Sequence, residues 1–175
     1  MDIWIQTAHM ICSTDPFSTI IPLSADVTTA NISDKPVYTD VVSDLSPEIL
    51  RKVHYVVADP RYDGKKMYDL SIKKDFQLVC PVKRYKRTSE ERLKLVDFYE
   101  SALGQVVYSR RSTSIEPLKE HIKSVFRMDP VPVKGLDKVR SILLLSALLY
   151  QMLVYYNCKT RKTGSRRAIK YLIGC

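Results

Sequence analysis

The sequence has few of the residues that mark fibrous, disordered or disulfide-rich proteins. Among its 175 residues are 5 glycines, 9 prolines, 4 cysteines and 1 tryptophan. So little glycine and proline, with 45% hydrophobic residues, excludes a collagen-like repeat, a mucin-like stalk and a disordered tail. The length is instead sufficient for one domain with its own core.

The cysteines and histidines form no pattern typical of metal ligands. Cys12, Cys80, Cys158 and Cys175 are scattered, without a Cys-x-x-Cys pair and without a histidine at ligand spacing. We therefore expect no zinc site, and reduced thiols in an intracellular protein. The first residues have no basic segment before an apolar stretch, so we also expect no secretory signal.

The longest apolar run is Ser141–Tyr156. It is shorter than the roughly 20 residues that span a bilayer, and it contains Ser146 and Gln151. We therefore predict one long core helix over 136–157, buried on most sides. A transmembrane helix is the alternative.

The charge is strongly positive, with 28 Lys+Arg against 19 Asp+Glu and a net charge of +9. This balance favours a polyanionic partner. Many cations gather in two segments, which are Lys83, Arg84, Lys86 and Arg87 after an apolar run, and Lys159, Arg161, Lys162, Arg166, Arg167 and Lys170 near the C-terminus. Both segments suit salt-dependent, sequence-independent binding to phosphates. A merely solubilising surface is the alternative.

Two apolar runs near the N-terminus, 8–13 and 19–27, are joined by a segment with the turn signal Asp15-Pro16. They predict a β-hairpin. Pro22 within the second run predicts a bulge or an edge position.

A βαβ unit is predicted next. Residues 53–58 (VHYVVA) form a nearly continuous apolar run, which is typical of a central parallel strand covered on both faces. A helix over 65–74 and a short strand over 76–81 follow it. Helices are also expected over 34–45, over 89–101 with Thr88 or Ser89 as N-cap, and from Ser114. The pattern predicts an α/β fold with a mixed sheet and covering helices.

Asp59 ends the apolar strand of this unit, at the edge of an α/β sheet where ligands and catalytic groups collect. A carboxylate leaving a buried strand is costly unless it meets a cation or hydrogen-bond donors. The alternative is a residue that only caps the Asp-Pro turn.

Glu116 precedes Pro117, which fits best in the first turn of a helix. We therefore expect Ser114 as N-cap and Glu116 in the first turn, where the helix dipole alone would favour an acid. An apolar stripe follows at helical spacing, formed by Ile115, Leu118, Ile122, Val125 and Phe126. Glu116 and Lys123 are expected about 20° apart at its margin.

The segment 108–123 reads YSRRSTSIEPLKEHIK. It resembles the Tyr-x2-Arg-x3-Glu-x6-Lys signature of the DDE transposases of bacterial and archaeal insertion sequences, with a gap of four between Arg111 and Glu116. The resemblance covers roughly 8–157. It includes the hairpin, the segment VVADPRYDGKKMYDL and the closing helices.

This resemblance implies an RNase H-like fold in which three carboxylates hold two divalent metals, normally Mg²⁺, during attack on a DNA phosphodiester. It makes Asp59 the second metal ligand and Glu116 the third. Arg111, Lys119 and Lys123 become candidates for phosphate contacts, with Tyr108 in support.

The first carboxylate of the family belongs to a strand before the hairpin. Asp2 has no strand before it, and Asp15 and Asp26 belong to the hairpin turn and to the strand after it. We therefore expect a partial RNase H-like catalytic domain over 1–157 that lacks the first strand, and a basic tail over 158–175.

The resulting hypothesis is a truncated transposase with low or no activity alone, cytoplasmic and associated with the nucleoid. Its partners would be the DNA of transposon ends and a second copy or a full-length transposase. A non-catalytic DNA-binding remnant is the alternative, and an RNase H-like nuclease outside the transposases is a third reading.

Overall fold

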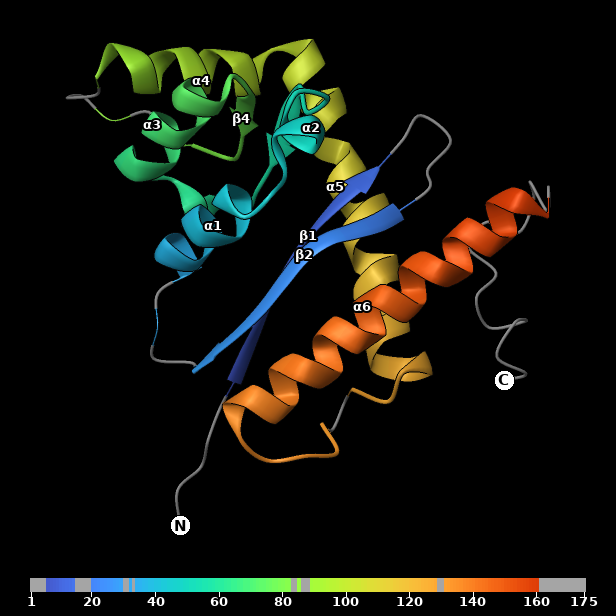
Figure 1. Cartoon of the computed structure of the whole chain (residues 1–175). Coiled ribbons are helices and arrows are strands. Elements are labelled where there is room, and N and C mark those ends of the chain that lie inside the picture. The colour runs from blue at the N-terminus through green and yellow to red at the C-terminus, as the bar shows by residue number, and fades with distance from the viewer. Residues whose placement is uncertain are drawn as a thin grey trace. The chain divides into compact units, whose positions relative to one another are not determined.

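The computed structural model describes residues 6–14, 20–29, 32, 34–82, 85, 89–128 and 131–160 (Figure 1). The chain divides into two compact units. The hairpin unit comprises Met1–Ile32 and Thr113–Cys175, and the βαβ unit comprises Ser33–Ser112.

The hairpin unit begins with β1 (Gln6–Thr14) and β2 (Ile20–Thr29), which pair antiparallel. The register shifts where Cys12 pairs with Pro22, so that Leu23 is the extra residue of a bulge. Proline cannot donate to the ladder, and a bulge beside it relieves that loss. The predicted hairpin and bulge are confirmed.

Helix α6 (Leu136–Lys159) lies along β2 and closes the core of the hairpin unit (Figure 1). Arg140 Nε donates to Asp26 Oδ1 at 2.6 Å, and Gln151 Nε2 donates to the carbonyl of Pro22 at 2.5 Å. These two bonds fix which side of α6 faces the strand. The predicted long helix is confirmed.

The predicted burial of α6 on most sides is wrong. Its packed side carries Val139, Leu143, Ala147, Tyr150 and Val154, all buried. A second face of α6 also carries large apolar side chains, and most of them are about half exposed or more. They are exposed because the described part of the hairpin unit packs against only one side of the helix. By length and composition alone α6 could cross a membrane, with a mean hydropathy of 1.4.

Helix α5 (Ala102–Glu120) begins directly after α4 (Glu90–Glu100). The Ser101 hydroxyl accepts from the backbone N–H of Gly104 at 3.0 Å and thereby caps the new helix. A Cβ at Gly104 would lie 2.0 Å from the Phe98 carbonyl oxygen. Glycine is therefore required for this close junction.

The predicted helix start near Ser114 is wrong, because α5 runs without a break through Pro117 and continues as a π-helical turn, η2 (His121–Val125). Proline removes one backbone hydrogen bond from a helix interior. Where α5 passes into η2, the ring nitrogen Nδ1 of His121 bonds to the carbonyl of Pro117 at 2.7 Å. The apolar stripe is confirmed: Leu118 and Ile122 are buried in the core formed with β2 and α6.

The βαβ unit contains β3 (Tyr55–Val57), α3 (Lys65–Lys74) and β4 (Gln77–Val79). The two strands are parallel, with Val56 opposite Leu78, and the βαβ prediction is confirmed. The strand that is buried is β4, against which α3 and α4 pack. The expectation that the first strand is covered on both faces is wrong, since Tyr55 is 41% exposed.

Short elements complete this unit. They are α1 (Asp34–Ser43), α2 (Pro47–Leu50) and the 3₁₀ turn η1 (Pro60–Tyr62), and α1 packs against α3 and η1. The hydroxyl of Ser89 accepts from the N–H of Arg92 at 3.4 Å, so its predicted role as N-cap of α4 is confirmed.

The α/β composition is confirmed, but the described strands do not form one mixed sheet. They form two separate two-stranded sheets, β1–β2 antiparallel and β3–β4 parallel. Each described strand therefore pairs with a single neighbour, which leaves its other edge unpaired within the described part of the chain.

We predict that Leu118→Ala lowers the free energy of unfolding by about 2–5 kcal/mol, because it removes a fully buried side chain between β2 and α6. The matched control is Leu103→Ala on the same helix, where the side chain is 52% exposed, with a change below about 0.5 kcal/mol. Urea unfolding measures both, and equal losses would contradict the core assignment.

Candidate active-site residues

Asp59 lies directly beyond β3, at the carboxyl end of the parallel strand pair. The pairing still reaches Ala58, whose N–H donates to the Val79 carbonyl at 3.0 Å. Asp59 precedes η1, but its side chain makes no capping hydrogen bond. The alternative reading of Asp59 as a residue that only caps the turn is therefore wrong.

The Asp59 carboxylate instead pairs with Arg111 of α5. Arg111 Nη1 lies 2.8 Å from Asp59 Oδ1, with the side chains 30% and 43% exposed. The pair joins the strand-end acid to the arginine of the Tyr-x2-Arg segment. Because both groups remain partly in water, the pair contributes at most about 1 kcal/mol to stability.

Tyr108 supports Arg111 from one helical turn earlier. Its ring centroid is 5.8 Å from the guanidinium carbon, and the ring of Tyr99 packs edge-on against it at 5.3 Å. Burial raises the pKa of Tyr108, and Arg111 partly offsets this shift. A neutral ring fixed between Tyr99 and the guanidinium limits the positions that Arg111 can take.

A second ion pair holds the turn that follows Asp59, and sequence analysis missed it. Arg92 Nε donates to Asp63 Oδ1 at 3.2 Å and its Nη2 pairs with Oδ2, with side chains only 13% and 23% exposed. The guanidinium also lies over the Tyr85 ring, 4.9 Å from its centroid. The partners are 29 residues apart, so no local pattern indicates the pair.

Glu116 belongs to the hairpin unit. Nζ of Lys119 lies 3.7 Å from Oε1 of Glu116, and the two side chains are 53% and 54% exposed, respectively. Since α5 begins at Ala102, the expectation of Glu116 in a first turn is wrong. Lys123 is exposed on η2. The predicted 20° between Glu116 and Lys123 assumed a continuous α-helix, whereas a π-helical turn, which holds more residues, begins at His121.

The structure thus brings Asp59 together with Arg111 and Tyr108 in the βαβ unit, and Glu116 with Lys119 in the hairpin unit. Other candidates lie outside the described residues, and these are Lys83, Arg84, Lys86, Arg87, Arg166, Arg167, Asp2 and Asp15. Asp26 is described, and its carboxylate binds Arg140 and the N–H of Val27.

The carboxylates are chemically suitable for a divalent metal, since hard cations such as Mg²⁺ prefer oxygen ligands. In the described ranges, however, no three His, Cys, Asp or Glu side chains come together as a metal-binding group. Asp59 and Glu116 each face a cationic side chain instead. Asp59 belongs to the βαβ unit and Glu116 to the hairpin unit, and neither unit holds, in its described residues, the complete three-carboxylate set that the resemblance implies.

The two arginine pairs should differ in stability. We predict that Arg92→Met lowers the free energy of unfolding by about 1–3 kcal/mol, because it removes the arginine that binds both oxygens of the largely buried Asp63 carboxylate. Arg111→Met, which exposes a carboxylate already in contact with water, should cost less than about 1 kcal/mol. Chemical unfolding of both variants measures the difference, and the reverse order would contradict the assignment of Arg92 as the structural anchor.

Comparison with models of protein families matches residues 3–152 to the family described as "Transposase DDE domain". No match is found among curated proteins or among solved structures. The matched segment is most of the chain, and it includes Asp59, Tyr108, Arg111 and Glu116. Members of this family act in DNA transposition and generally use a divalent metal. The chain belongs to the transposase DDE domain family.

Proposed function

We propose that the chain is the C-terminal part of the catalytic domain of an insertion-sequence transposase. In this proposal residues 1–157 form an RNase H-like domain without its first strand, and residues 158–175 are a basic tail. The family match over 3–152 carries the proposal. It is supported by the order of the described elements, which is a hairpin, a βαβ unit and two long helices.

In the proposed site, Asp59 is the second metal ligand and Glu116 the third, and the metal is Mg²⁺. The remaining ligand, the first carboxylate of the set, would come from a strand before residue 8. A chain with two of three ligands should cleave and join DNA weakly or not at all by itself, because divalent metals in such sites are held mainly by carboxylate oxygens.

Phosphate contacts are assigned to cationic side chains around these acids, with Tyr108 holding Arg111 in place. Support comes from the partial exposure of Arg111 and Lys119 and the exposed position of Lys123. The remaining proposed DNA contacts are Lys83, Arg84, Lys86, Arg87, Arg166 and Arg167. Such contacts give affinity without sequence specificity.

The proposed partners are the DNA of transposon ends and another transposase chain, either a second copy of this one or a full-length enzyme. The proposed location is the cytoplasm, in association with the nucleoid.

A second candidate function is a non-catalytic DNA-binding remnant that occupies transposon ends or inhibits a full-length transposase. The observation that favours it is that each proposed metal ligand lies beside a cationic side chain, Asp59 beside Arg111 and Glu116 beside Lys119.

We predict that the isolated chain nicks supercoiled DNA at a trace level or not at all with Mg²⁺. Asp59→Asn or Glu116→Gln should abolish any residual nicking, since each removes a proposed metal ligand. Agarose gels of the DNA products measure this, with Asp69→Asn as a control at an exposed acid that pairs with Lys65. Robust nicking that survives both variants would reject the site assignment.

The truncation is tested separately at the level of DNA sequence. An in-frame strand bearing an aspartate directly upstream of Met1 would place the missing ligand in a longer protein. If adding that segment restores nicking, and Asp59→Asn then removes it, the catalytic function is supported over the remnant.

DNA binding should depend steeply on salt. Replacing Lys83, Arg84, Arg166 and Arg167 with glutamine should reduce the slope of log affinity against log salt by about 3–4, one unit for each lost phosphate contact. Fluorescence anisotropy with a labelled duplex measures the slope. A control variant with Lys65, Lys66, Lys73 and Lys74 of α3 replaced by glutamine removes the same charge, and an equal effect would show that net charge alone drives binding.

A further inference from the structure

Helix α6 carries a second apolar stripe that the described residues leave uncovered. Its members are large side chains that are 43–63% exposed, namely Leu144, Leu145, Leu148, Leu149, Met152, Tyr155 and Tyr156. No charged residue occurs between Arg140 and Lys159. A helix without a polar face is normally covered on all sides, so something is expected to cover this stripe.

The spacing of the stripe indicates another helix as the covering element. Leu145, Leu148, Met152 and Tyr155 follow one another at steps of three, four and three residues, and Leu149 and Tyr156 flank the same seam. This is the 3.5-residue repeat with which two α-helices pack side chains into each other. A second copy of α6 presents the same repeat.

The size of the stripe also suits a dimer. Seven large side chains, each about half exposed, make an apolar patch on the order of 600 Å². A standard interface buries about 800 Å² on each partner, so the stripe and a narrow polar rim would suffice. The patch is also at the upper end of what a monomer leaves exposed, about 300–600 Å².

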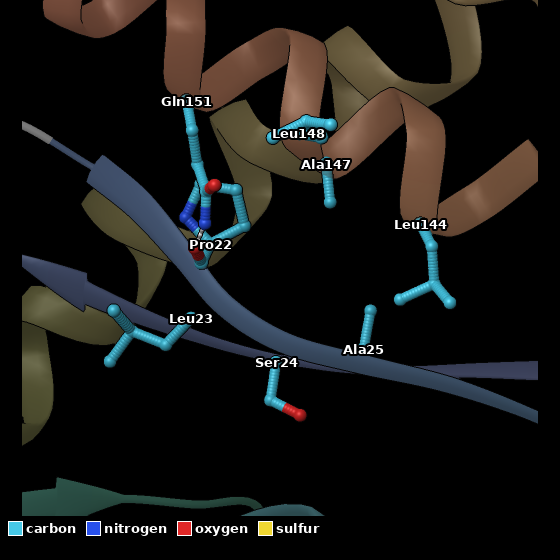
Figure 2. Close-up of a pocket in the computed structure, with 8 residues that line it drawn as sticks. All are labelled: Pro22, Leu23, Ser24, Ala25, Leu144, Ala147, Leu148 and Gln151. Atoms are coloured by element: carbon cyan, nitrogen blue, oxygen red, sulfur yellow. Dashed lines mark hydrogen bonds between the residues drawn. The ribbon is translucent and has the colours of Figure 1, made fainter. Parts of the chain in front are cut away.

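The surface of the stripe is hollowed where partner side chains would enter. Figure 2 shows Leu144 and Leu148 at its edge, beside Ala147 and Gln151, above the Pro22–Ala25 segment of β2, where a cavity of about 160 Å³ lies. A larger hollow of about 450 Å³ lies over Met152, Tyr155 and Tyr156.

Two other occupants fit less well. An uncharged stripe offers nothing to the phosphates of DNA. If α6 crossed a lipid bilayer, lipid would surround it, but Arg140 and Gln151, beside the stripe, are bonded to β2. Leaving β2 would break both bonds and expose the core of the hairpin unit.

We propose that the exposed stripe of α6 docks on the same stripe of a second copy of this chain, forming a symmetric dimer. The inference deepens the proposed function, because it gives a surface to the homodimer included there. Its test needs no DNA, so that its failure and the failure of the transposase function are seen separately.

The full chain is examined by sedimentation equilibrium from low to high micromolar concentration. The expected result is a reversible dimer, and Leu145→Gln with Met152→Gln should raise its dissociation constant at least about a hundredfold. Both side chains are at least 60% exposed, so circular dichroism should be unchanged. The matched control is Ile72→Gln with Val106→Gln, which replaces exposed apolar side chains on α3 and α5 and should leave the dimer intact.

Two results would overturn the proposal. One is a monomer at every concentration, and the other is a dimer that the Leu145 and Met152 variants leave unchanged. In a monomer, resistance of Leu148→Cys to a soluble thiol reagent would show that another part of the chain covers the stripe. If the chain is monomeric but binds DNA with the predicted salt dependence, only the dimer proposal fails.

Discussion

The docking of α6 on β2 decides what the hairpin unit buries and what it presents. Because α6 is apolar on two sides and the hydrophobic effect is not directional, burial alone does not select one face. The two hydrogen bonds from Arg140 to Asp26 and from Gln151 to Pro22 make that selection. If another face of α6 met β2, the part-buried Asp26 carboxylate and Pro22 carbonyl would lose these donors. Each buried polar group left without a partner costs about 1–3 kcal/mol.

The position of Asp59 is likewise set by a polar partner. A strand that ends in a carboxylate needs a cation or donors at that end, and α5 provides Arg111 at 2.8 Å. The turn beyond it is fixed independently by Asp63 and Arg92. The position of Asp59 thus depends on two helices of the βαβ unit, since Arg111 belongs to α5 and Arg92 to α4. Because ion pairs hold both Asp59 and Asp63, the turn between them has little freedom to move. This suits a carboxylate that must keep a defined position.

Much of the local structure was predictable because it depends on local signals. The Pro22 bulge, the Ser89 cap and the βαβ order follow from residues close in sequence. The start of the Glu116 helix was predicted wrongly, since Pro117 suggests a first turn while the junction at Gly104 starts the helix much earlier. Helix propensity and tertiary packing then carry it through the proline.

The candidate site was predictable in part. The Tyr-x2-Arg half of the motif identifies Arg111 through family resemblance, but it does not indicate the ion pair with Asp59, because 52 residues separate the two in the chain, as their numbers show. Neither Asp63 nor Arg92 belongs to a motif that the sequence analysis identified. Long-range ion pairs form wherever the fold brings opposite charges together, and a single sequence holds no record of such pairings.

The pairing of Arg111 with Asp59 is compatible with a role on DNA. A guanidinium has five N–H donors in a planar fork, and the 2.8 Å contact with Asp59 uses one nitrogen, Nη1. With about a third of the side chain exposed, the other donors can reach a phosphate while the carboxylate stays neutralised. Lys119, which is 3.7 Å from Glu116, has three donors on a flexible stem and can do the same. In the proposed function, the cations that neutralise Asp59 and Glu116 are thus the groups best placed to retain DNA binding in a chain that does not cleave.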